Sequence, residues 1–348
     1  MTRLPTTNSN AAVLVVGPAW VGDMVLAQSL FIALRARPGN PAVDVIAPPW
    51  SMPLLARMPE VRQAISLPVA HGELALRRRW SLGRRLRDRH YQQGIVLPRS
   101  AKAALPLRAA GIPLRTGFRG EFRFALLNDM RDREQAAYRT VDRFLSLGFD
   151  AGAPLPEPTP VPRLVASPGD AREARVALDL PEDGRPVLAL CPGAEYGPAK
   201  RWPAEYYADI ARRRLQQGWQ VWLLGSDKDR AICQQIRDRA QGASVLAGRT
   251  SLGQAIDLLA VADLVVSNDS GLMHIAAATG TRVVAIYGSS DPRYTPPMNP
   301  RARVLTLDLD CSPCFQRECP LGHLNCLRQL EPDRVHRAAE ELLQQESA

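Results

Sequence analysis

The sequence predicts an α/β protein made of two Rossmann-like domains that face each other across a cleft. Short apolar runs alternate with amphipathic stretches in both halves of the chain, which is typical of parallel sheets with helical crossovers. The chain has 348 residues, more than the roughly 250–300 that a single hydrophobic core usually supports. Between the halves, residues 151–170 contain six prolines in twenty positions.

This proline-rich stretch is expected to be a stiff, extended linker, because proline removes a backbone donor and disfavours helices and inner strands. We therefore predict an N-terminal domain at 1–165 and a C-terminal domain at 166–330. Residues 331–348 should add a helix over Pro332–Gln345, with proline just inside its start.

In the first half the predicted order is strand, helix, strand, strand and helix. The fully apolar run Ala12–Val16 is a strand, and Gly22–Arg37 is a helix that ends near a glycine. Strands Val43–Ile46 and Gly94–Leu97 and a helix over Gln135–Leu147 continue the pattern.

In the second half the same alternation is more regular and implies right-handed crossovers between parallel strands. The predicted strands are Pro186–Leu190, Val221–Leu224, Leu264–Ser267 and Val283–Tyr287, and the predicted helices are Pro203–Gln217, Lys228–Gln241, Leu252–Ala260 and Leu272–Ala278.

Composition and charge narrow the class of protein. Hydrophobic residues make up 46% of the chain and charged residues 23%, as in ordinary globular proteins. No apolar run is long enough to span a bilayer and the start does not resemble a signal peptide, so we expect a cytoplasmic protein, at most resting on a membrane face. Residues 1–170 carry 23 Lys and Arg against 13 Asp and Glu, whereas residues 171–348 carry 21 against 22. The basic half indicates an anionic partner: nucleic acid, phospholipid or a phosphorylated substrate.

The most informative motif is the turn Asp269-Ser270-Gly271, where a buried strand ends and a helix begins at once. Asp269 or Ser270 can cap the helix, and Gly271 lets a ligand approach the backbone. The N–H groups and dipole of a helix start favour a diphosphate, and ligands of open α/β sheets bind at the carboxyl ends of strands. An ordinary helix cap is the alternative. His274, one turn into the helix, either reaches a phosphate oxygen or is structural.

A second motif, CPGAEYGPAKRWP at residues 191–203, leaves a strand as a loop rich in glycine and proline and then enters a helix. Lys200 and Arg201 stand at the end of this loop, where they suit phosphate charge. The alternative is a loop with two exposed cations and no function. Neither the Walker spacing nor G-x-G-x-x-G occurs, which weighs against a P-loop enzyme and an NAD enzyme.

The third motif, GPAWVGD at residues 17–23, follows the first strand. Gly22 and Asp23 open a helix at the top of the first predicted sheet. A carboxylate there would face the ligand of the second domain and could take a proton from an attacking hydroxyl. The alternative is an aspartate that only caps its helix.

Together these segments resemble glycosyltransferase family nine, the ADP-heptose:lipopolysaccharide heptosyltransferases, which have the GT-B fold. The resemblance runs over nearly the whole chain, through GPAWVGDMVLAQSLF, LLARMPEV, RTGFRGEFRFALLND, CPGAEYGPAKRWP, LLGSDKD and NDSGLMHIAAA. It implies an inverting transfer of L-glycero-D-manno-heptose from ADP-heptose to the first heptose of the inner core, heptosyl-Kdo2-lipid A, with release of ADP. It also implies that no cofactor is required, and that the protein works peripherally on the cytosolic face of the inner membrane.

Two alternatives remain from the residues. One is another GT-B transferase, such as a heptosyltransferase that acts on Kdo2-lipid A. The other is a non-catalytic nucleotide-sugar-binding protein, against which the presence of both Asp23 and Lys200 argues. A nucleic-acid partner is not expected, because no recognition motif occurs and the basic residues lack interleaved aromatics.

The resemblance further implies roles for the two domains and for single residues. The N-terminal domain would bind the acceptor and the C-terminal domain the ADP-sugar. Asp23 would be the general base, and Lys200 would neutralise the leaving diphosphate. Asp269 would hold sugar hydroxyls, with the other donor-binding positions at Glu195, Asp229, Ser270, Gly271, Leu272 and His274.

Cations of the basic half suit the Kdo carboxylates and lipid A phosphates of such an acceptor. Those that lie in or near the family-like segments are Arg57, Arg99, Lys102, Arg119 and Arg123. An arginine-rich run over residues 77–89 either touches anionic lipid headgroups or forms a solvated helix face.

Residues 311–326 form a cysteine cluster with the spacing C-x2-C-x4-C-x3-H-x2-C. Four of its five soft ligands would suffice for a structural Zn²⁺ ion in a cytosolic protein. The alternatives are reduced cysteines that pack a loop, and a disulfide. Cys191 and Cys233 are expected in the core. The candidate zinc ligands are Cys311, Cys314, Cys319, His323 and Cys326.

Overall fold

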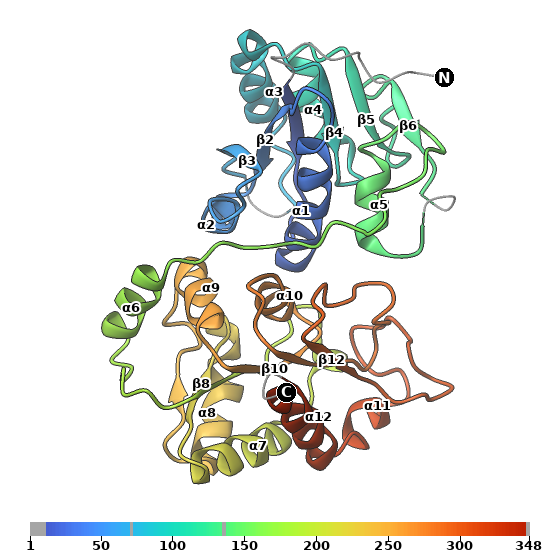
Figure 1. Cartoon of the computed structure of the whole chain (residues 1–348). Coiled ribbons are helices and arrows are strands. Elements are labelled where there is room, and N and C mark those ends of the chain that lie inside the picture. The colour runs from blue at the N-terminus through green and yellow to red at the C-terminus, as the bar shows by residue number, and fades with distance from the viewer. Residues whose placement is uncertain (1–11, 70–71, 134–136, 346–348) are drawn as a thin grey trace. The chain divides into compact units, whose positions relative to one another are not determined.

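The computed structural model describes residues 12–69, 72–133 and 137–345. The chain divides into two compact units, Met1–Pro162 (unit 1) and Arg163–Ala348 (unit 2). Each unit holds one six-stranded sheet whose neighbouring strands are all parallel (Figure 1). The predicted α/β class with two Rossmann-like sheets is confirmed.

In unit 1 the strand order is β3-β2-β1-β4-β5-β6, so the direction in which the sheet grows reverses between β1 and β4. The strands are β1 (Ala12–Val16), β2 (Ala42–Ala47), β3 (Val61–Ser66), β4 (Gln93–Val96), β5 (Leu114–Phe118) and β6 (Asp129–Arg131). The helices are α1 (Val21–Arg35), α2 (Met52–Leu55), α3 (Leu76–Arg85), α4 (Ala101–Ala109) and α5 (Thr140–Ser146), with 3-10 turns η1 (Pro49–Ser51) and η2 (Arg87–Arg89).

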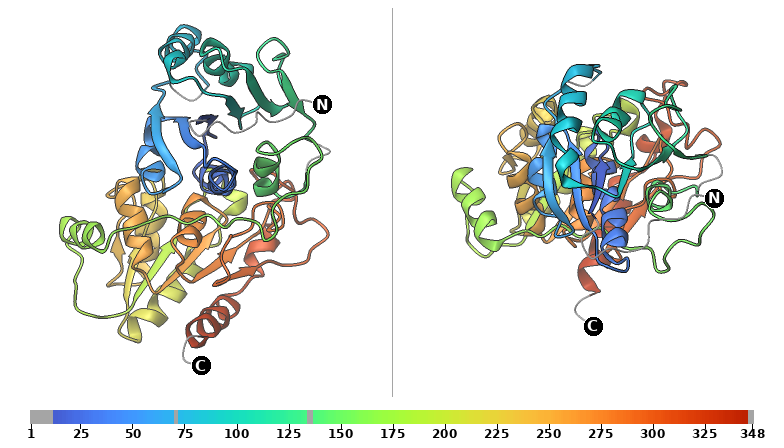
Figure 2. Two further views of the ribbon diagram at one scale, coloured as in Figure 1. Left: turned by 45° about the horizontal axis from the view of Figure 1, so that its top comes forward. Right: turned by 90° about the horizontal axis from the view of Figure 1, so that it is seen from above.

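Both faces of this sheet are covered. Helices α3 and α4 pack against each other on one face, and α1 and α5 pack against each other on the opposite face (Figure 2, left). The central strand β1 is therefore buried along its whole length. A sheet covered on both sides needs continuous apolar strands, and the sequence AVLVV supplies one.

In unit 2 the strand order is β12-β11-β10-β7-β8-β9, with a reversal between β10 and β7. The strands are β7 (Val187–Cys191), β8 (Gln220–Leu223), β9 (Ser244–Val245), β10 (Leu264–Asn268), β11 (Val283–Ile286) and β12 (Ala302–Leu305). The helices are α6 (Pro168–Ala177), α7 (Ala204–Gln216), α8 (Arg230–Arg239), α9 (Leu252–Ala260), α10 (Gly271–Ala278), α11 (Asn325–Arg328) and α12 (Pro332–Gln344), with 3-10 turns η3 (Pro198–Lys200) and η4 (Asp227–Asp229).

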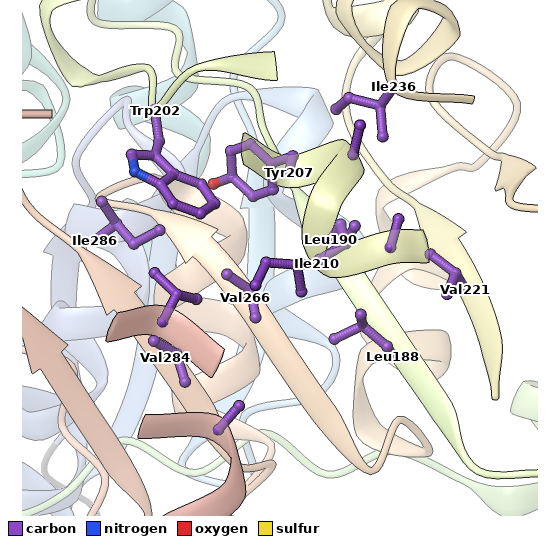
Figure 3. Packing of buried hydrophobic residues seen from close by; sticks show 14 of the residues in the cluster. Leu188, Leu190, Trp202, Tyr207, Ile210, Val221, Ile236, Val266, Val284 and Ile286 are labelled. Carbon is purple, nitrogen blue, oxygen red and sulfur yellow. The ribbon is translucent and has the colours of Figure 1, made fainter. Parts of the chain in front are cut away.

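The core of unit 2 joins one face of the sheet to α7, α8 and α12 (Figure 3). Alternate strand residues point to this face, such as Leu188 and Leu190 of β7, as the two-residue repeat of a strand requires. Trp202 and Tyr207 close the cluster, with their rings edge to face and their centroids 5.0 Å apart. Both side chains have no exposed surface, so the start of α7 is fixed by the core.

The predicted bounds of elements were most accurate for an uninterrupted apolar strand and for a helix with capping residues at its start. Ala12–Val16 and Leu252–Ala260 have the predicted bounds. The extended linker ends earlier than predicted, because Pro168 begins α6 after the capping residue Ser167. The predicted helix Gln135–Leu147 begins only at Thr140, and residues 135 and 136 lie outside the described residues. Among the described residues, no helix has the length and apolar character needed to cross a membrane.

Candidate functional site

The candidate site of unit 2 lies where the sheet reverses direction. Strands β7 and β10 are neighbours, but the connections that follow them lead to opposite sides of the sheet. Two loops therefore diverge from adjacent carboxyl ends and leave a crevice in which ligands of such sheets bind. The loop after β7 carries Lys200, and the turn after β10 carries Asp269.

Lys200 and Asp269 form an ion pair at this place, although they lie 69 positions apart in the sequence. The side chain of Asp269 is 5% exposed and that of Lys200 is 16% exposed. Ser290, in the loop after β11, donates its hydroxyl to the same Oδ2 of Asp269 over 2.5 Å. Because the pair is largely removed from water, its charges are screened much less than those of a surface pair.

Asn268, the last residue of β10, ties the turn after β10 to the loop that carries Lys200. Its Nδ2 donates to the carbonyl of Pro192 over 2.7 Å, at the start of the lysine loop. Its Oδ1 accepts from the backbone N–H of Trp202 and from the hydroxyl of Tyr207, each over 3.0 Å. One buried amide thus anchors both ends of the loop that carries Lys200, which fixes where the ammonium group points.

Helix α10 starts directly beyond the carboxylate. Ser270 is its N-cap, and the Ser270 hydroxyl accepts from the backbone N–H of Met273 over 3.5 Å. The N–H groups of Gly271 and Leu272 belong to the first turn, which has no intrahelical acceptors for them. Such a helix start can bind an anion through its N–H groups and its dipole.

His274 lies one turn into α10 and is buried. Burial lowers the pKa of His274, the Asp269 carboxylate opposes this in part and the Lys200 charge adds to it, and the result is a pKa of about 4. Its Nε2 lies 3.9 Å from Oδ1 of Asp269. The imidazole is therefore neutral near pH 7 and supports the Asp269 side of the site.

Tyr196 connects the lysine loop to the cysteine-containing loop of residues 311–326. Lys200 Nζ lies 5.0 Å from the centroid of the tyrosine ring, and the Arg317 guanidinium lies 5.4 Å from it. The tyrosine hydroxyl donates to the carbonyl of Phe315 over 2.6 Å, and Ala199 N–H donates to the carbonyl of Arg317 over 3.0 Å. The cysteine-containing loop thus supports the turn that presents Lys200.

Comparison with known proteins decides the family. The model of glycosyltransferase family 9 (heptosyltransferase) matches residues 79–325. The chain is 42% identical to lipopolysaccharide heptosyltransferase 2 of Escherichia coli K12 over 347 residues, covering 97% of this chain and 99% of that protein. The chain belongs to glycosyltransferase family 9.

Two further comparisons agree with this membership. Lipooligosaccharide heptosyltransferase 2 of Haemophilus ducreyi is 41% identical, with 95% of this chain and 99% of that protein covered. The solved structure of the E. coli ADP-heptose lipopolysaccharide heptosyltransferase II matches with a TM-score of 0.85 at 41% identity, over 97% of this chain and 100% of that one. The family and the fold inferred from the sequence motifs are confirmed.

The other two predicted donor residues lie in this family 9 glycosyltransferase at the loops after β7 and β8: Glu195 in the lysine loop and Asp229 in η4. Glu195 is exposed and forms an ion pair with Lys228 over 2.5 Å. The carboxylate of Asp229 accepts from the backbone N–H and the hydroxyl of Ser226, over 2.9 Å and 2.8 Å, in a capping box. Asp229 therefore shapes the loop after β8, and its part in donor binding stays a prediction.

In unit 1 the predicted general base also lies at a sheet reversal. Asp23 is half-buried in the first turn of α1, directly after β1. Arg99 and Lys102 follow β4, the neighbour of β1, and Arg119 follows β5. Parallel strands end at one edge of a sheet, so these four residues belong to the same edge.

The remaining two predicted acceptor residues differ from this group. Arg57 is half-buried between α2 and β3 and donates to the carbonyl of Pro53 over 3.1 Å. Arg123 is 1% exposed and donates to the carbonyls of Pro98 and Phe118. Burial lowers the pKa of Arg123 to about 10, with a contribution from the nearby Arg99 charge. Arg123 therefore braces its loop, and its side chain is committed to the carbonyls of Pro98 and Phe118.

The six cysteines differ in their burial: three are buried and three are partly exposed. Cys191 and Cys233 are buried in the core, as predicted, and all six cysteines are free thiols, so the disulfide alternative is not realised. Burial raises the pKa of Cys326 to about 11, and the nearby sulfurs of Cys311, Cys314 and Cys319 add to the effect. Within residues 12–69, 72–133 and 137–345, no group of three or more His, Cys, Asp or Glu is arranged to hold a metal ion.

Two residues of the site were missed in the sequence. Asn268 stands inside the motif already singled out, but its role depends on contacts with Pro192 and Trp202 that no local pattern reveals. Ser290 follows β11 in the sequence Gly-Ser-Ser-Asp. The sequence signal for Ser290 was a polar turn directly after a predicted buried strand. The carboxyl end of that strand, β11, adjoins the carboxyl end of β10.

Proposed function

We propose that this family 9 enzyme transfers L-glycero-D-manno-heptose from ADP-L-glycero-D-manno-heptose to the first heptose of the lipopolysaccharide inner core, heptosyl-Kdo2-lipid A. The transfer inverts the anomeric centre and releases ADP. The nearly full-length similarity to heptosyltransferases 2 supports this choice. The observation that carries it is the Lys200–Asp269–Ser290 cluster at the start of α10.

The donor would bind in unit 2. In this proposal the N–H groups of Ser270, Gly271 and Leu272 bind the diphosphate, while the Asp269 carboxylate accepts hydrogen bonds from sugar hydroxyls. Lys200 then shares its charge between Asp269 and the diphosphate. Its ammonium is already held within reach of the helix start by the ion pair, so little side-chain freedom is lost when the donor arrives.

Asp23 of unit 1 would act as the general base. The acceptor hydroxyl gives its proton to the carboxylate, and its oxygen attacks C1 of the heptose on the face opposite the diphosphate. The bond between C1 and the phosphate oxygen breaks, and that electron pair leaves with ADP. Lys200 and the α10 dipole stabilise the charge that accumulates on the leaving diphosphate.

The acceptor would bind to unit 1 through cations at the carboxyl edge of its sheet. Arg99, Lys102 and Arg119 belong to that edge, and Arg57 adds a further cation. Guanidinium groups form paired hydrogen bonds with carboxylates and phosphates, the anions of Kdo and lipid A. With such an acceptor the enzyme would work peripherally on the cytosolic face of the inner membrane.

The proposed reaction takes its positive charge from Lys200 and a helix start, so no cofactor has a part in it. The structural Zn²⁺ ion suggested by the cysteine spacing remains a separate prediction. Metal analysis of the purified protein decides it, and much less than one equivalent of zinc would reject it.

The reaction itself is tested by incubating the enzyme with ADP-heptose and either heptosyl-Kdo2-lipid A or Kdo2-lipid A. We expect a heptose to be added to heptosyl-Kdo2-lipid A only, as measured by the mass of the product lipid. Transfer only to Kdo2-lipid A would identify the enzyme that adds the first heptose. If neither lipid is modified while ADP-heptose still binds, the protein is a nucleotide-sugar-binding protein.

A further inference from the structure

The packed pair α3 and α4 in unit 1 carries an exposed row of apolar side chains beside a row of cations, which the proposed donor and acceptor sites do not use. Leu74, Leu76 and Trp80 are 63%, 53% and 41% exposed. We call this the α3–α4 surface, and its residues are Leu74, Leu76, Arg77, Trp80, Arg84, Arg85 and Leu105.

Helix geometry places these side chains in one continuous band. Leu76 and Trp80 are one turn apart, and Arg84 follows one turn further along the same side. Arg77 and Arg85 lie on the adjoining side of α3, away from the buried positions Leu82 and Gly83. The helix thus presents an apolar edge next to a cationic face, which is the pattern of helices that lie in a membrane interface.

The platform under this band is rigid. A Cβ atom added to Gly83 would lie 2.6 Å from the Cβ of Ala109, so α3 and α4 cross at close contact. Lys102 of α4 donates to the carbonyls of Gly72 and Glu73, over 2.8 Å and 3.1 Å, which fixes the segment before α3. The exposed position of Leu74 and Leu76 is therefore held by the fold.

The surface is hollowed as well as exposed. A shallow, open hollow of about 660 Å³ lies between α3 and Leu105 of α4. A second hollow of about 300 Å³ adjoins Leu74 and Leu76. Phe122 and Phe124, which are 96% and 61% exposed, stand in the sequence between Glu121 and Leu126, two residues that line this second hollow.

Charge indicates what covers this surface. Helix α3 contains five arginines and no acidic residue, and only Arg79 among them is buried. Among the described residues, Arg77, Arg84 and Arg85 have no ion-pair partner of their own. Tryptophan and arginine side by side are favoured at the boundary between lipid headgroups and acyl chains, where each has a long apolar body and a polar tip.

We propose that the α3–α4 surface docks on an anionic phospholipid bilayer. Leu76 and Trp80 would enter the apolar boundary, and Arg77 and Arg84 would bind lipid phosphates. This inference rests on the proposed function only in that the acceptor is a membrane lipid. It assigns the attachment to residues other than those proposed to bind that acceptor, although the proposed acceptor residue Lys102 borders the second hollow.

The test measures flotation of the full-length enzyme with vesicles of phosphatidylcholine that contain about 30 mol% phosphatidylglycerol and no acceptor lipid. Two arginines near a surface contribute roughly 1 kcal/mol each, so Arg77→Gln/Arg84→Gln should weaken binding roughly thirtyfold. Leu76→Ser/Trp80→Ser should weaken it roughly tenfold or more through lost apolar burial. The matched controls in unit 2 are Arg334→Gln/Arg337→Gln on α12 and Val176→Ser/Leu321→Ser, which should bind as the wild type does.

Two results would overturn the proposal: unchanged binding of both surface variants, or wild-type binding to pure phosphatidylcholine as tight as to anionic vesicles. The variants are also assayed with a deacylated heptosyl-Kdo acceptor in solution. There they should transfer heptose at the wild-type rate, because none of the four substituted residues is among those proposed to bind the donor or the acceptor. Loss of vesicle binding with normal transfer supports the docking surface, whereas absence of transfer in the wild type counts against the proposed function alone.

Discussion

At the scale of single residues, one carboxylate organises the candidate site. Oδ2 of Asp269 accepts from both the Lys200 ammonium and the Ser290 hydroxyl, and Oδ1 lies 3.9 Å from His274. A buried carboxylate with a full set of partners is stable, whereas removal of one partner leaves a costly charge. A donor that draws Lys200 or Ser290 away from Asp269 must therefore give the carboxylate another hydrogen-bond donor. A ligand with hydroxyl groups for Asp269 and negative charge for Lys200 meets this requirement.

His274 makes this cluster sensitive to acid. Its pKa is about 4 in the folded chain against 6.5 for an ordinary histidine. Between these pH values the unfolded chain binds a proton that the folded chain does not, so the free energy of unfolding should fall as the pH is lowered. The loss is about 3 kcal/mol when the pH falls through this whole window. Urea unfolding measured between about pH 7 and about pH 4.5 checks it.

The variant His274→Gln keeps a neutral hydrogen-bonding group and should remove this part of the pH dependence. Asp and Glu residues contribute their own acid sensitivity, so the slopes of variant and wild type are compared. His90→Asn replaces an exposed histidine that has a positive φ of 50°, which asparagine tolerates. His90→Asn should keep the wild-type slope of the free energy of unfolding against pH. If His274→Gln also keeps that slope, His274 is not the source of the acid sensitivity.

At the scale of elements, the loops that follow neighbouring strands are fitted to one another. A Cβ atom at Gly193, in the lysine loop after β7, would lie 2.6 Å from Oδ2 of Asp229, in η4 after β8. That oxygen already accepts from Ser226 in the capping box at the start of η4 and α8. The glycine is thus required by the close approach of two loops, and its backbone angles would be open to other residues.

Gly193→Ala should therefore push the carboxylate of Asp229 out of its capping box. We expect a loss of about 1 kcal/mol in the free energy of unfolding, the usual cost of a lost cap. Asp229→Ala should cost about the same. The double variant should cost no more than either single one, because the cap can be lost only once. Urea unfolding of the three variants measures this.

Gly169→Ala is the control for this pair. A Cβ atom there meets only the Ser167 hydroxyl, at an ordinary 3.4 Å, in the first turn of α6. It should leave stability unchanged or raise it slightly, because alanine loses less entropy in a helix. Additive costs for Gly193→Ala and Asp229→Ala would show that the two loops are not coupled.

Helices of this chain differ in how well the sequence alone predicts them. Helix α9 was predictable to the residue, since the Ser251 and Gln254 side chains form a capping box at its start. Helices α3 and α4 were not predicted as elements, because five arginines hide the apolar period of α3 and α4 contains Pro106. Their stability comes from mutual packing at Gly83, a tertiary contact that local propensity does not record.

At the scale of the whole molecule, the two-sheet architecture followed from the sequence, because alternating strands and helices leave little choice other than parallel sheets. The order of the strands within each sheet could not be predicted from the sequence. The sequence therefore did not show that β7 and β10 are neighbours. For this reason Lys200 could be proposed to neutralise the diphosphate and Asp269 to hold sugar hydroxyls, but the ion pair between them could not be foreseen. The anchoring of the lysine loop by Asn268 depends on the same strand order.

The two units should divide the reaction between them, and substitutions can separate their parts. Asp23→Ala in unit 1 should lower kcat by about 10²- to 10⁴-fold, the usual contribution of a general base, and leave the affinity for ADP unchanged. Lys200→Ala in unit 2 should weaken ADP binding about tenfold or more, as expected for a lost charge-assisted hydrogen bond, and lower kcat as well. Isothermal titration with ADP and steady-state rates with heptosyl-Kdo2-lipid A give both quantities for each variant.

Lys200→Arg keeps the charge next to Asp269 and should recover part of the ADP affinity, which separates the effect of charge from that of a disturbed fold. Because Lys200→Ala also removes the ammonium that balances the buried charge of Asp269, the stability of this variant is measured alongside. Weaker ADP binding by a folded Asp23→Ala protein would contradict the division between the units. Wild-type turnover of Asp23→Ala would remove Asp23 as the base, and wild-type ADP affinity of Lys200→Ala would remove Lys200 from the diphosphate site.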